Sequence, residues 1–267
     1  MRYAILADVH ANLHALEAVL AEASRADVDS YVCAGDLVGY GPQPNECVAL
    51  IAGLETTCVA GNHDLIALGS LSEDRSSRLA LNTLRWTREV LDDAARAYLA
   101  ALPLRASAPG GVIVAHGSLE DPEEYVLQRA QAERELKRIE DEHPDARVLV
   151  LGHTHAAQAW APDGRRAPSA PGTRLALAGA PRWLLNPGSV GQSRQRLPHA
   201  RFMLLDVERQ EATFHAVSYD RAGARRALRR NGLPAGSLHR PPTGPRSWAR
   251  RLRWRARRLR ARVMKRR

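Results

Sequence analysis

The sequence predicts an α/β fold with parallel strands, and two observations lead to this prediction. Short apolar runs recur along the chain, and runs unbroken by polar residues are typical of strands that are covered on both faces. Helical patterns lie between the first of these runs, and an alternation of strands and helices favours a parallel sheet. In open α/β sheets ligands bind beyond the carboxyl ends of the strands, so we expect the site at one such edge.

The first half of the chain alternates between the two kinds of element. Residues 3–7, 31–34 and 57–60 are apolar runs that predict strands, and residues 112–115 and 148–151 add two more. Leu13, Leu16, Val19, Leu20 and Ala23 mark one face of a helix. A second helix follows the turn-rich segment GPQPN, with Cys47, Val48, Leu50, Ile51 and Leu54 on its apolar face.

The later part of the chain predicts a second, mixed or antiparallel sheet. Residues 183–185, 202–207 and 212–218 are predicted strands, and only the hairpin-like residues 208–211 separate the last two. Helical stretches cover residues 73–102, which end at Pro103, and residues 127–142. Together these elements allow two sheets sandwiched between helices.

Composition excludes several classes of protein. The 267 residues are 45% apolar and 25% charged, and no apolar run approaches the roughly 18 residues of a spanning helix. The N-terminus shows no secretory segment, and three cysteines without metal-type spacing suggest reduced thiols, so we expect a cytoplasmic protein. Both lysines are followed by arginine, which excludes a Walker A loop, and the absence of GxSxG excludes the common serine-hydrolase elbow.

The basic charge is concentrated at the C-terminus. The net charge is +10, but residues 241–267 hold twelve basic and no acidic side chains, so residues 1–240 carry a net charge of −2. We therefore expect a catalytic domain over residues 1–240 and an Arg-rich tail over residues 241–267. The tail has the apolar stripe of an amphipathic helix, and like-charge repulsion makes a disordered tail an equal alternative. Either form suits nucleic acid or an anionic membrane.

Polar clusters follow five of the predicted strands directly. They bring together carboxylate, amide and imidazole side chains, namely Asp8, His10, Asp36, Asn62, His116, His153 and His155. One metal ion rarely needs seven ligands, whereas two divalent ions about 3.5 to 4 Å apart, bridged by one carboxylate, would use them all. Such pairs catalyse phosphoryl displacement, and their positive charge suits a phosphate substrate. The sequence therefore predicts a dinuclear metal site.

These clusters resemble the motifs of the calcineurin-like metallophosphoesterases. The matching segments are DVH at 8–10, GDLVGYG at 35–41, GNHD at 61–64, HG at 116–117 and GHTH at 152–155. The segments GPQPNEC and NPGSVGQ are similar to a bacterial branch of predicted phosphoesterases. The resemblance covers residues 1 to about 234 and implies a four-layer α/β/β/α sandwich of two mixed sheets.

The resemblance also implies a role for each residue of the clusters. Asp8, His10, Asp36 and His155 would hold one metal, Asp36 would bridge to the second, and Asn62, His116 and His153 would complete that second site. His63 would stand beside the leaving-group oxygen as proton donor or electrostatic stabiliser, and Asn62 would also touch the phosphate.

One departure from the wider family bears on the substrate. Serine/threonine phosphatases of this superfamily read GDxxDRG, and this chain has Gly39 and Tyr40 where their Asp and Arg stand. The Asp that supports the general-acid histidine and the Arg that grips phosphate are missing there, which argues against protein phosphatase activity. Tyr40 is interpreted as lining the substrate entrance or, equally, as packing on the sheet edge.

Several nearby residues have two interpretations each. Asp64 could orient a ligand histidine or form a turn, and Asn12 could cap the first helix, contact phosphate, or do both. Asn186, Gly188 and Gly191 are expected to form a tight loop near the site, with a turn of positive φ as the preferred role.

The predicted function is a dinuclear metal-dependent phosphoesterase in which metal-bound hydroxide attacks phosphorus. A small phosphodiester or nucleotide is the first expected substrate, and the alternatives are a nuclease that uses the basic tail or a non-catalytic metal-stabilised protein that binds nucleic acid or membrane. Mixed nitrogen and oxygen ligands suit Mn, Fe, Co, Ni or Zn, with Mn placed first. The sequence does not indicate the oligomeric state.

Overall fold

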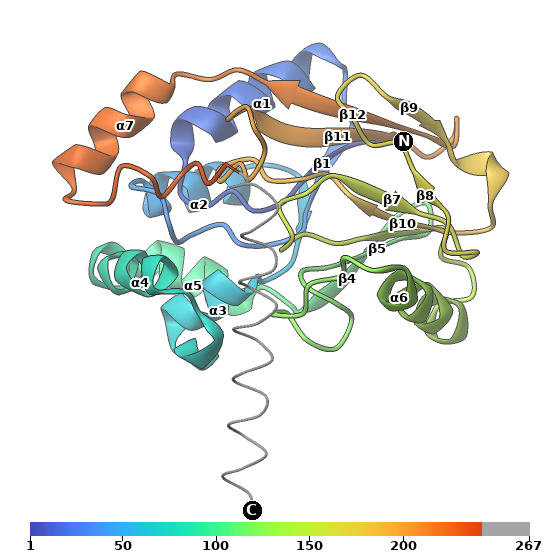
Figure 1. Cartoon of the computed structure of the whole chain (residues 1–267), viewed down its shortest axis with the longest axis horizontal. Coiled ribbons are helices and arrows are strands. Elements are labelled where there is room, and N and C mark those ends of the chain that lie inside the picture. The colour runs from blue at the N-terminus through green and yellow to red at the C-terminus, as the bar shows by residue number, and fades with distance from the viewer. Residues whose placement is uncertain (242–267) are drawn as a thin grey trace, which may run out of the picture.

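The computed structural model describes residues 1–241, in which two six-stranded sheets pack face to face between helices (Figure 1). The first sheet has the strand order β3-β2-β1-β11-β12-β9. β1 (Arg2–Leu6), β2 (Ser30–Cys33) and β3 (Thr56–Cys58) pair in parallel. β11 (Ala200–Asp206), β12 (Glu211–Val217) and β9 (Arg174–Ala176) extend it in antiparallel fashion. The sheet is therefore mixed.

The second sheet is mixed in the same way, with the order β4-β5-β6-β10-β7-β8. Its centre is parallel: β5 (Val112–Ala115), β6 (Val148–Val150) and β10 (Trp183–Asn186). β4 (Arg105–Ala108), β7 (Gln158–Trp160) and β8 (Arg166–Ala167) are antiparallel additions at its edges. The predicted four-layer α/β/β/α sandwich of two mixed sheets is confirmed.

Three apolar clusters separate the four layers. Alternate residues of β1 point to opposite faces, so Ala4 and Leu6 pack toward the helices of the first sheet while Tyr3 and Ile5 pack between the two sheets. The third cluster joins the far face of the second sheet to α6 (Arg129–Glu142) through Leu136 and other residues. Central strands such as β5 and β6 are covered on both faces, and they read as unbroken apolar runs.

Helices cover the outer face of the first sheet (Figure 1). α1 (Leu13–Arg25) and α2 (Pro44–Ala52) agree with the predicted helices, although α2 ends before Leu54. α3 (Asn62–Leu68) begins inside the GNHD cluster, and α7 (Arg221–Arg230) follows β12. Short 3-10 turns lie at Glu73–Arg75 and Leu177–Gly179.

The helical stretch expected over residues 73–102 is divided into two helices. Ser77 caps α4 (Arg78–Val90) by accepting from the Ala80 N–H, and Asp92 caps α5 (Asp93–Ala101) by accepting from the Ala95 N–H. Two separate N-caps start two separate helices. The helix expected from residue 127 begins at Arg129, because Gln128 is its N-cap.

The predicted Arg-rich tail lies outside the described residues apart from Pro241. Within residues 1–241, no helix has both the length and the apolar character needed to cross a membrane.

Candidate metal centre

The carboxyl ends of five strands meet on one side of the sandwich, and they come from both sheets. β1, β2 and β3 belong to the first sheet, whereas β5 and β6 belong to the second. The expected single sheet edge is therefore two facing edges, and the site lies where they converge. The eleven site residues named from the sequence are all buried, namely Asp8, His10, Asn12, Asp36, Tyr40, Asn62, His63, Asp64, His116, His153 and His155.

Left-handed backbone turns aim these side chains inward. Nine residues other than glycine have positive φ within residues 1–241, and seven of them follow β1, β2 or β6 at the site: Asp8, His10, Ala11, Asp36, Tyr40, His153 and His155. Such conformations cost about 1–3 kcal/mol for non-glycine residues and cluster at functional sites. The chain thus accepts backbone strain at the site after β1, β2 and β6.

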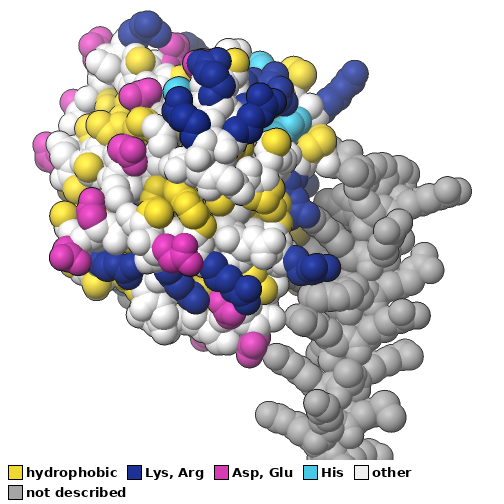
Figure 2. All heavy atoms as spheres, turned by 90° about the vertical axis from the view of Figure 1, so that its left-hand side faces the viewer, with side chains coloured by type: hydrophobic (Ala, Val, Ile, Leu, Met, Phe, Trp, Pro, Cys, Tyr) yellow, Lys and Arg dark blue, Asp and Glu magenta, His cyan; other side chains and the backbone are white. Residues whose placement is uncertain are grey.

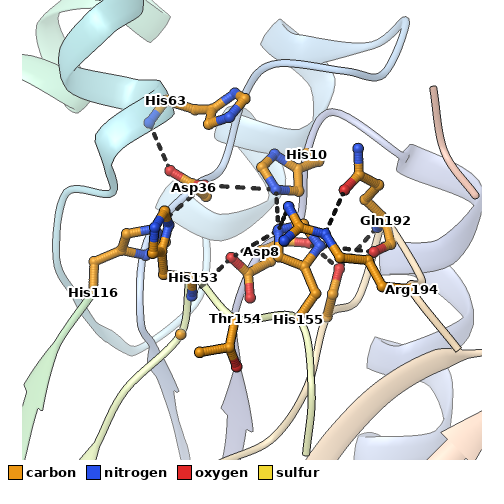
Figure 3. Close-up of polar contacts among 12 residues, drawn as sticks. Asp8, His10, Asp36, His63, His116, His153, Thr154, His155, Gln192 and Arg194 are labelled. Carbon is orange, nitrogen blue, oxygen red and sulfur yellow. Dashed lines mark hydrogen bonds and ion pairs between the residues drawn. The ribbon is translucent and has the colours of Figure 1, made fainter. Parts of the chain in front are cut away.

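Asp36 lies at the centre of the cluster (Figure 3). Its Oδ2 is 3.5 Å from His10 Nε2 and 3.3 Å from His116 Nε2, while its Oδ1 accepts from the His63 backbone N–H at 2.8 Å. Asp8 lies on the other side, with Oδ1 3.6 Å from His155 Nε2. Asp36 therefore stands between two groups of donors, which is the position that a bridging carboxylate needs.

Three imidazoles are oriented by backbone carbonyls. Nδ1 of His10, His116 and His155 lies 3.1, 2.6 and 2.7 Å from the carbonyl oxygens of Val38, Ala34 and Gln192, respectively. A carbonyl accepts, so Nδ1 carries the proton in each ring and Nε2 faces the centre. His153 is turned the other way, with Nε2 3.2 Å from the Glu123 carbonyl. In metal-binding histidines, the ring nitrogen that does not bind the metal usually donates to a carbonyl or carboxylate, as the hydrogen bonds of these four rings would allow.

The facing atoms fit a cation. Oδ2 of Asp8 and Oδ2 of Asp36 are buried and have no hydrogen-bond partner among residues 1–241, and Nε2 of His10 lies 3.2 Å from Nε2 of His155. Two acceptor nitrogens at that separation repel each other unless a positive charge joins them. Ligand atoms lie within 4.8 Å of one another in three groups: Asp8 with His10 and His155; His10 with Asp36 and His63; and Asp36 with His116 and His153.

Burial and charge set the protonation of the cluster. Burial lowers the pKa of His10, His153 and His155 well below the usual value, so these rings are neutral and their lone pairs are available to a metal. Burial also raises the pKa of Asp8 to about 7. At His116 burial lowers the pKa, but the charge and hydrogen bond of Asp36, the charge of Asp8 and the Ala34 carbonyl together outweigh it, and the pKa rises to about 10. The carboxylates thus attract positive charge to the centre.

His63 lies beside this cluster on α3. Its ring centroid is 4.8 Å from His10 and 4.6 Å from Tyr40. Burial is the main cause that lowers its pKa to about 4, so the ring is neutral near pH 7. The buried Nδ1 has no hydrogen-bond partner among residues 1–241. Tyr40 packs on both rings and is 4% exposed, so it lies against the site.

Asn62 also points into the cluster. Its Oδ1 lies 3.1 Å from His116 Nε2, on the side of Asp36 that His116 and His153 share. The structure therefore brings all seven predicted ligands together, and their division between two ions stays a prediction.

Asn12 and Asp64 have structural partners. Asn12 Oδ1 accepts from the Ala15 N–H and caps α1, while its Nδ2 donates to the Gly191 carbonyl. The Asp64 carboxylate accepts from the backbone N–H groups of Val38 and Gly61. These bonds connect the GDLVGYG segment to the start of α3. No histidine hydrogen bond to Asp64 is seen in residues 1–241, so its turn-forming interpretation is the one that the contacts support.

The NPGSVGQ loop packs directly under the centre. Gly188 has φ +84°, as expected for a turn, but Gly191 does not need positive φ. A Cβ on Gly191 would lie 1.7 Å from the Val9 carbonyl oxygen, so close backbone approach requires this glycine. Asn186 donates to the Gly152 carbonyl at 2.6 Å and accepts from the Gly188 N–H.

The sequence reasoning missed Arg194, Gln192 and Tyr125. Arg194 follows the NPGSVGQ segment by two residues, and its guanidinium lies at the centre beside His155 (Figure 3). The only available signal was its nearness to that motif, because a single arginine in a basic sequence has no pattern of its own.

Comparisons with known proteins agree with this geometry. A family model of the calcineurin-like phosphoesterase superfamily domain matches residues 1–210. An uncharacterised protein of Methanocaldococcus jannaschii is 31% identical over 236 residues, which cover 86% of this chain and 93% of that protein.

Two solved structures share the fold. A metallophosphoesterase of Sphaerobacter thermophilus superposes with a TM-score of 0.78 at 36% identity, covering 89% of this chain and 96% of that one. A hypothetical protein of Pyrococcus horikoshii superposes with a TM-score of 0.72 at 20% identity and the same coverage. The chain belongs to the calcineurin-like phosphoesterase superfamily.

Proposed function

We propose that this protein hydrolyses a small phosphodiester or a nucleotide with the help of two divalent metal ions, Mn²⁺ being the first to test. The observation that carries the proposal is the position of Asp36, whose Oδ2 lies within 3.5 Å of both His10 Nε2 and His116 Nε2. Membership of the superfamily supports phosphoester hydrolysis as the reaction class.

In this proposal two ligand sets lie around that carboxylate. Asp8, His10 and His155 would hold one ion, and His116, His153 and Asn62 would hold the other. Bound there, the ions would supply a water of lowered pKa and would neutralise charge on the phosphoryl oxygens. The carbonyl-anchored rings keep their donor atoms fixed, so little reorganisation is needed when substrate arrives.

His63 is assigned to the leaving group. Its neutral ring can donate an N–H hydrogen bond to the departing oxygen, which stabilises the negative charge that develops there. The family resemblance implies that His63 acts either as a proton donor or as an electrostatic stabiliser. The lowered pKa favours the electrostatic role, because a neutral imidazole has no extra proton to give. Tyr40 packs on the same ring and limits its movement. Asn62 is the proposed phosphate contact.

The test combines a metal-site variant with a substrate panel. Asp36→Asn should lose both Mn²⁺ binding and turnover, because the variant removes the charge shared by the two ligand sets. Purified protein should be assayed with Mn²⁺ against phosphomonoesters, phosphodiesters, dinucleotide polyphosphates and RNA. Absence of turnover with Mn, Fe, Co, Ni and Zn would favour the non-catalytic alternative.

A second candidate, a nuclease, is favoured by the surface of α7. Five exposed arginines lie on this helix (Arg221, Arg225, Arg226, Arg229 and Arg230), and Lys and Arg side chains gather on that side of the molecule in Figure 2. A polyanion held by several arginines should dissociate steeply between low and moderate salt. Deleting residues 241–267 should weaken RNA binding if the tail takes part, and should leave hydrolysis of a small ester unchanged.

A further inference from the structure

We infer that Arg194 binds an ionised oxygen of the substrate's phosphoryl group and that Tyr125 positions the guanidinium for this role. The inference rests on the proposed function and adds a recognition residue to it. Arg194 lies on the loop between β10 and β11, and Tyr125 lies on the loop between β5 and α6. These two loops come from different parts of the chain and meet over the metal centre.

The guanidinium is held by three neutral groups. Its Nε donates to Gln192 Oε1 at 3.2 Å, and its Nη2 lies 3.1 Å from His155 Nε2 (Figure 3). Its Nη1 donates to the Tyr125 hydroxyl at 3.3 Å. Arg194 forms no ion pair with a carboxylate within 4.0 Å among residues 1–241. A largely buried guanidinium with neutral partners is costly unless an anion completes it.

Two of its five N–H groups remain for that anion. The three contacts use one hydrogen on each nitrogen, and an arginine side chain carries five N–H donors in a fixed fork. Such a fork matches two oxygens of a phosphate group. The serine/threonine phosphatases have a phosphate-binding Arg where this chain has Tyr40. Arg194 would supply that phosphate contact from a different loop.

The charge of Arg194 acts on groups of both predicted ligand sets. Burial is the largest cause of the pKa shift at each of these groups. The Arg194 charge adds to the fall in the pKa of His10, His63, His153 and His155 and opposes the rise in the pKa of Asp8 and Tyr40.

Arg194 also competes with a cation for His155. One lone pair on Nε2 accepts one bond, so this nitrogen serves either the Nη2 of Arg194 or a metal ion. Metal binding therefore frees one further N–H of Arg194. It follows that Arg194 opposes metal binding, through both its contact and its charge, while it favours anion binding.

Tyr125 fixes the side chain from the other loop. Its hydroxyl accepts from Arg194, its ring lies 5.9 Å from the guanidinium carbon, and the same ring lies 4.1 Å from the His153 ring. The Glu123 carbonyl, two residues earlier, contacts His153 Nε2. One short segment thus supports both a predicted metal ligand and the anion-binding arginine.

This arrangement defines a substrate class. Phosphomonoesters and phosphodiesters carry at least one ionised non-bridging oxygen for Arg194, whereas a phosphotriester carries none. We expect anionic esters to depend on Arg194 and neutral triesters to be indifferent to it.

The test uses Arg194→Ala, Arg194→Lys and the matched control Arg196→Ala, which removes the same charge from an exposed position on the same loop. Calorimetry measures Mn²⁺ binding and then inorganic phosphate binding to the Mn²⁺-loaded protein. Arg194→Ala should bind phosphate about 10- to 100-fold more weakly, which is the usual value of a charge-assisted hydrogen bond. It should bind Mn²⁺ more tightly, by about tenfold, because a nearby like charge is removed.

The opposite signs distinguish recognition from a structural role. Arg194→Lys should keep part of the phosphate affinity, Tyr125→Phe should lose a few-fold of it, and Arg196→Ala should match the wild type. Weaker Mn²⁺ binding in Arg194→Ala, or unchanged phosphate binding, overturns the inference while the phosphoesterase function stands. Failure of the wild-type protein to bind Mn²⁺ at all would instead remove the proposed function on which it rests.

Discussion

A Cβ atom on Gly39 would lie 2.3 Å from Nδ1 of His63, so the backbone of the GDLVGYG segment lies directly against that imidazole. Gly39 has φ +83°, a conformation that side chains rarely adopt. The glycine and the ring therefore fix each other: the loop takes a turn that only glycine favours, and the ring fills the space that a side chain would need.

Gly39→Ala should displace His63 and lower kcat. The added methyl group cannot occupy its position unless the ring moves, and the positive φ adds strain. We expect kcat to fall about 10- to 100-fold, because a small misplacement of a catalytic group has effects of this size. Mn²⁺ content should stay unchanged, since the substitution removes none of the seven predicted ligands.

Gly53→Ala is the matched control for this change. Gly53 ends α2 in a right-handed conformation, and its nearest neighbour to an added Cβ is 3.4 Å away. Its kcat should equal that of the wild type. A normal kcat in Gly39→Ala as well would show that the His63 position is not set by this contact.

His63→Ala should lower kcat for an alkyl phosphodiester by about 10² to 10⁴, the range for loss of a group that assists proton transfer or charge stabilisation. Metal content measured by elemental analysis should be retained, because the seven predicted ligands remain. The loss should be much smaller for a nitrophenyl ester, whose leaving group needs little assistance. Unchanged turnover of the alkyl ester would remove the leaving-group role.

Much of the fold could be predicted because the buried strands contain apolar runs that stand out in the sequence. β5 and β6 are wholly apolar, β1 and β2 are apolar after their first residue, and each of the four is followed by a polar cluster. The division of those strands between two sheets could not be derived from periodicity, because strands covered on both faces look alike whichever sheet they join. The family resemblance supplied that division.

Weakly patterned elements escaped prediction. β4 reads RASA and lies at an edge, and β8 has only two residues. The inner face of α7 is made of glycine, alanine and one leucine between arginines, so its apolar stripe is faint.

The predicted ligands were recognisable because they stand in sequence motifs, whereas the groups that support them were not. The carbonyl groups that orient His10, His116 and His155 carry no signature, since every residue has one. Arg194 reaches the centre through its loop conformation, which local sequence does not fix. The positions of these carbonyl groups and of Arg194 depend on long-range packing, which the motifs do not reveal.

Asn186→Ala should destabilise the protein and weaken Mn²⁺ binding. The substitution leaves the Gly188 N–H without its side-chain acceptor and removes one of the two donors to the buried Gly152 carbonyl, which keeps the Thr154 N–H. An unpaired buried group costs about 1–3 kcal/mol, so the melting temperature should fall by about 4–8 °C for a loss near 2 kcal/mol. Calorimetry should show weaker Mn²⁺ binding, because the loop that carries His153 and His155 is released.

Asn45→Ala provides a comparison away from the site. Asn45 also donates to a backbone carbonyl, that of Val90, but it lies on α2 and is not a site residue. It should lower the melting temperature while Mn²⁺ affinity stays at the wild-type value. Equal Mn²⁺ affinity in Asn186→Ala would contradict the supporting role of that residue.

His215→Phe should make the stability of the protein less sensitive to acid. His215 is half-buried on β12 and stacks on Phe202 at 4.8 Å, and burial lowers its pKa below the usual value of 6.5. The unfolded chain therefore binds a proton at a higher pH than the folded chain does. The stability that neutral His215 supports is complete above about pH 6.5 and is lost as the pH falls below that value.

The measurement compares melting temperatures at pH 7.5 and pH 5.5. The fall in melting temperature between these two pH values should be larger for the wild type than for His215→Phe, which keeps an aromatic ring but has no group that titrates. The site histidines titrate alike in both proteins, so equal drops would mean that His215 does not contribute, and a smaller wild-type drop would mean that the sign is wrong.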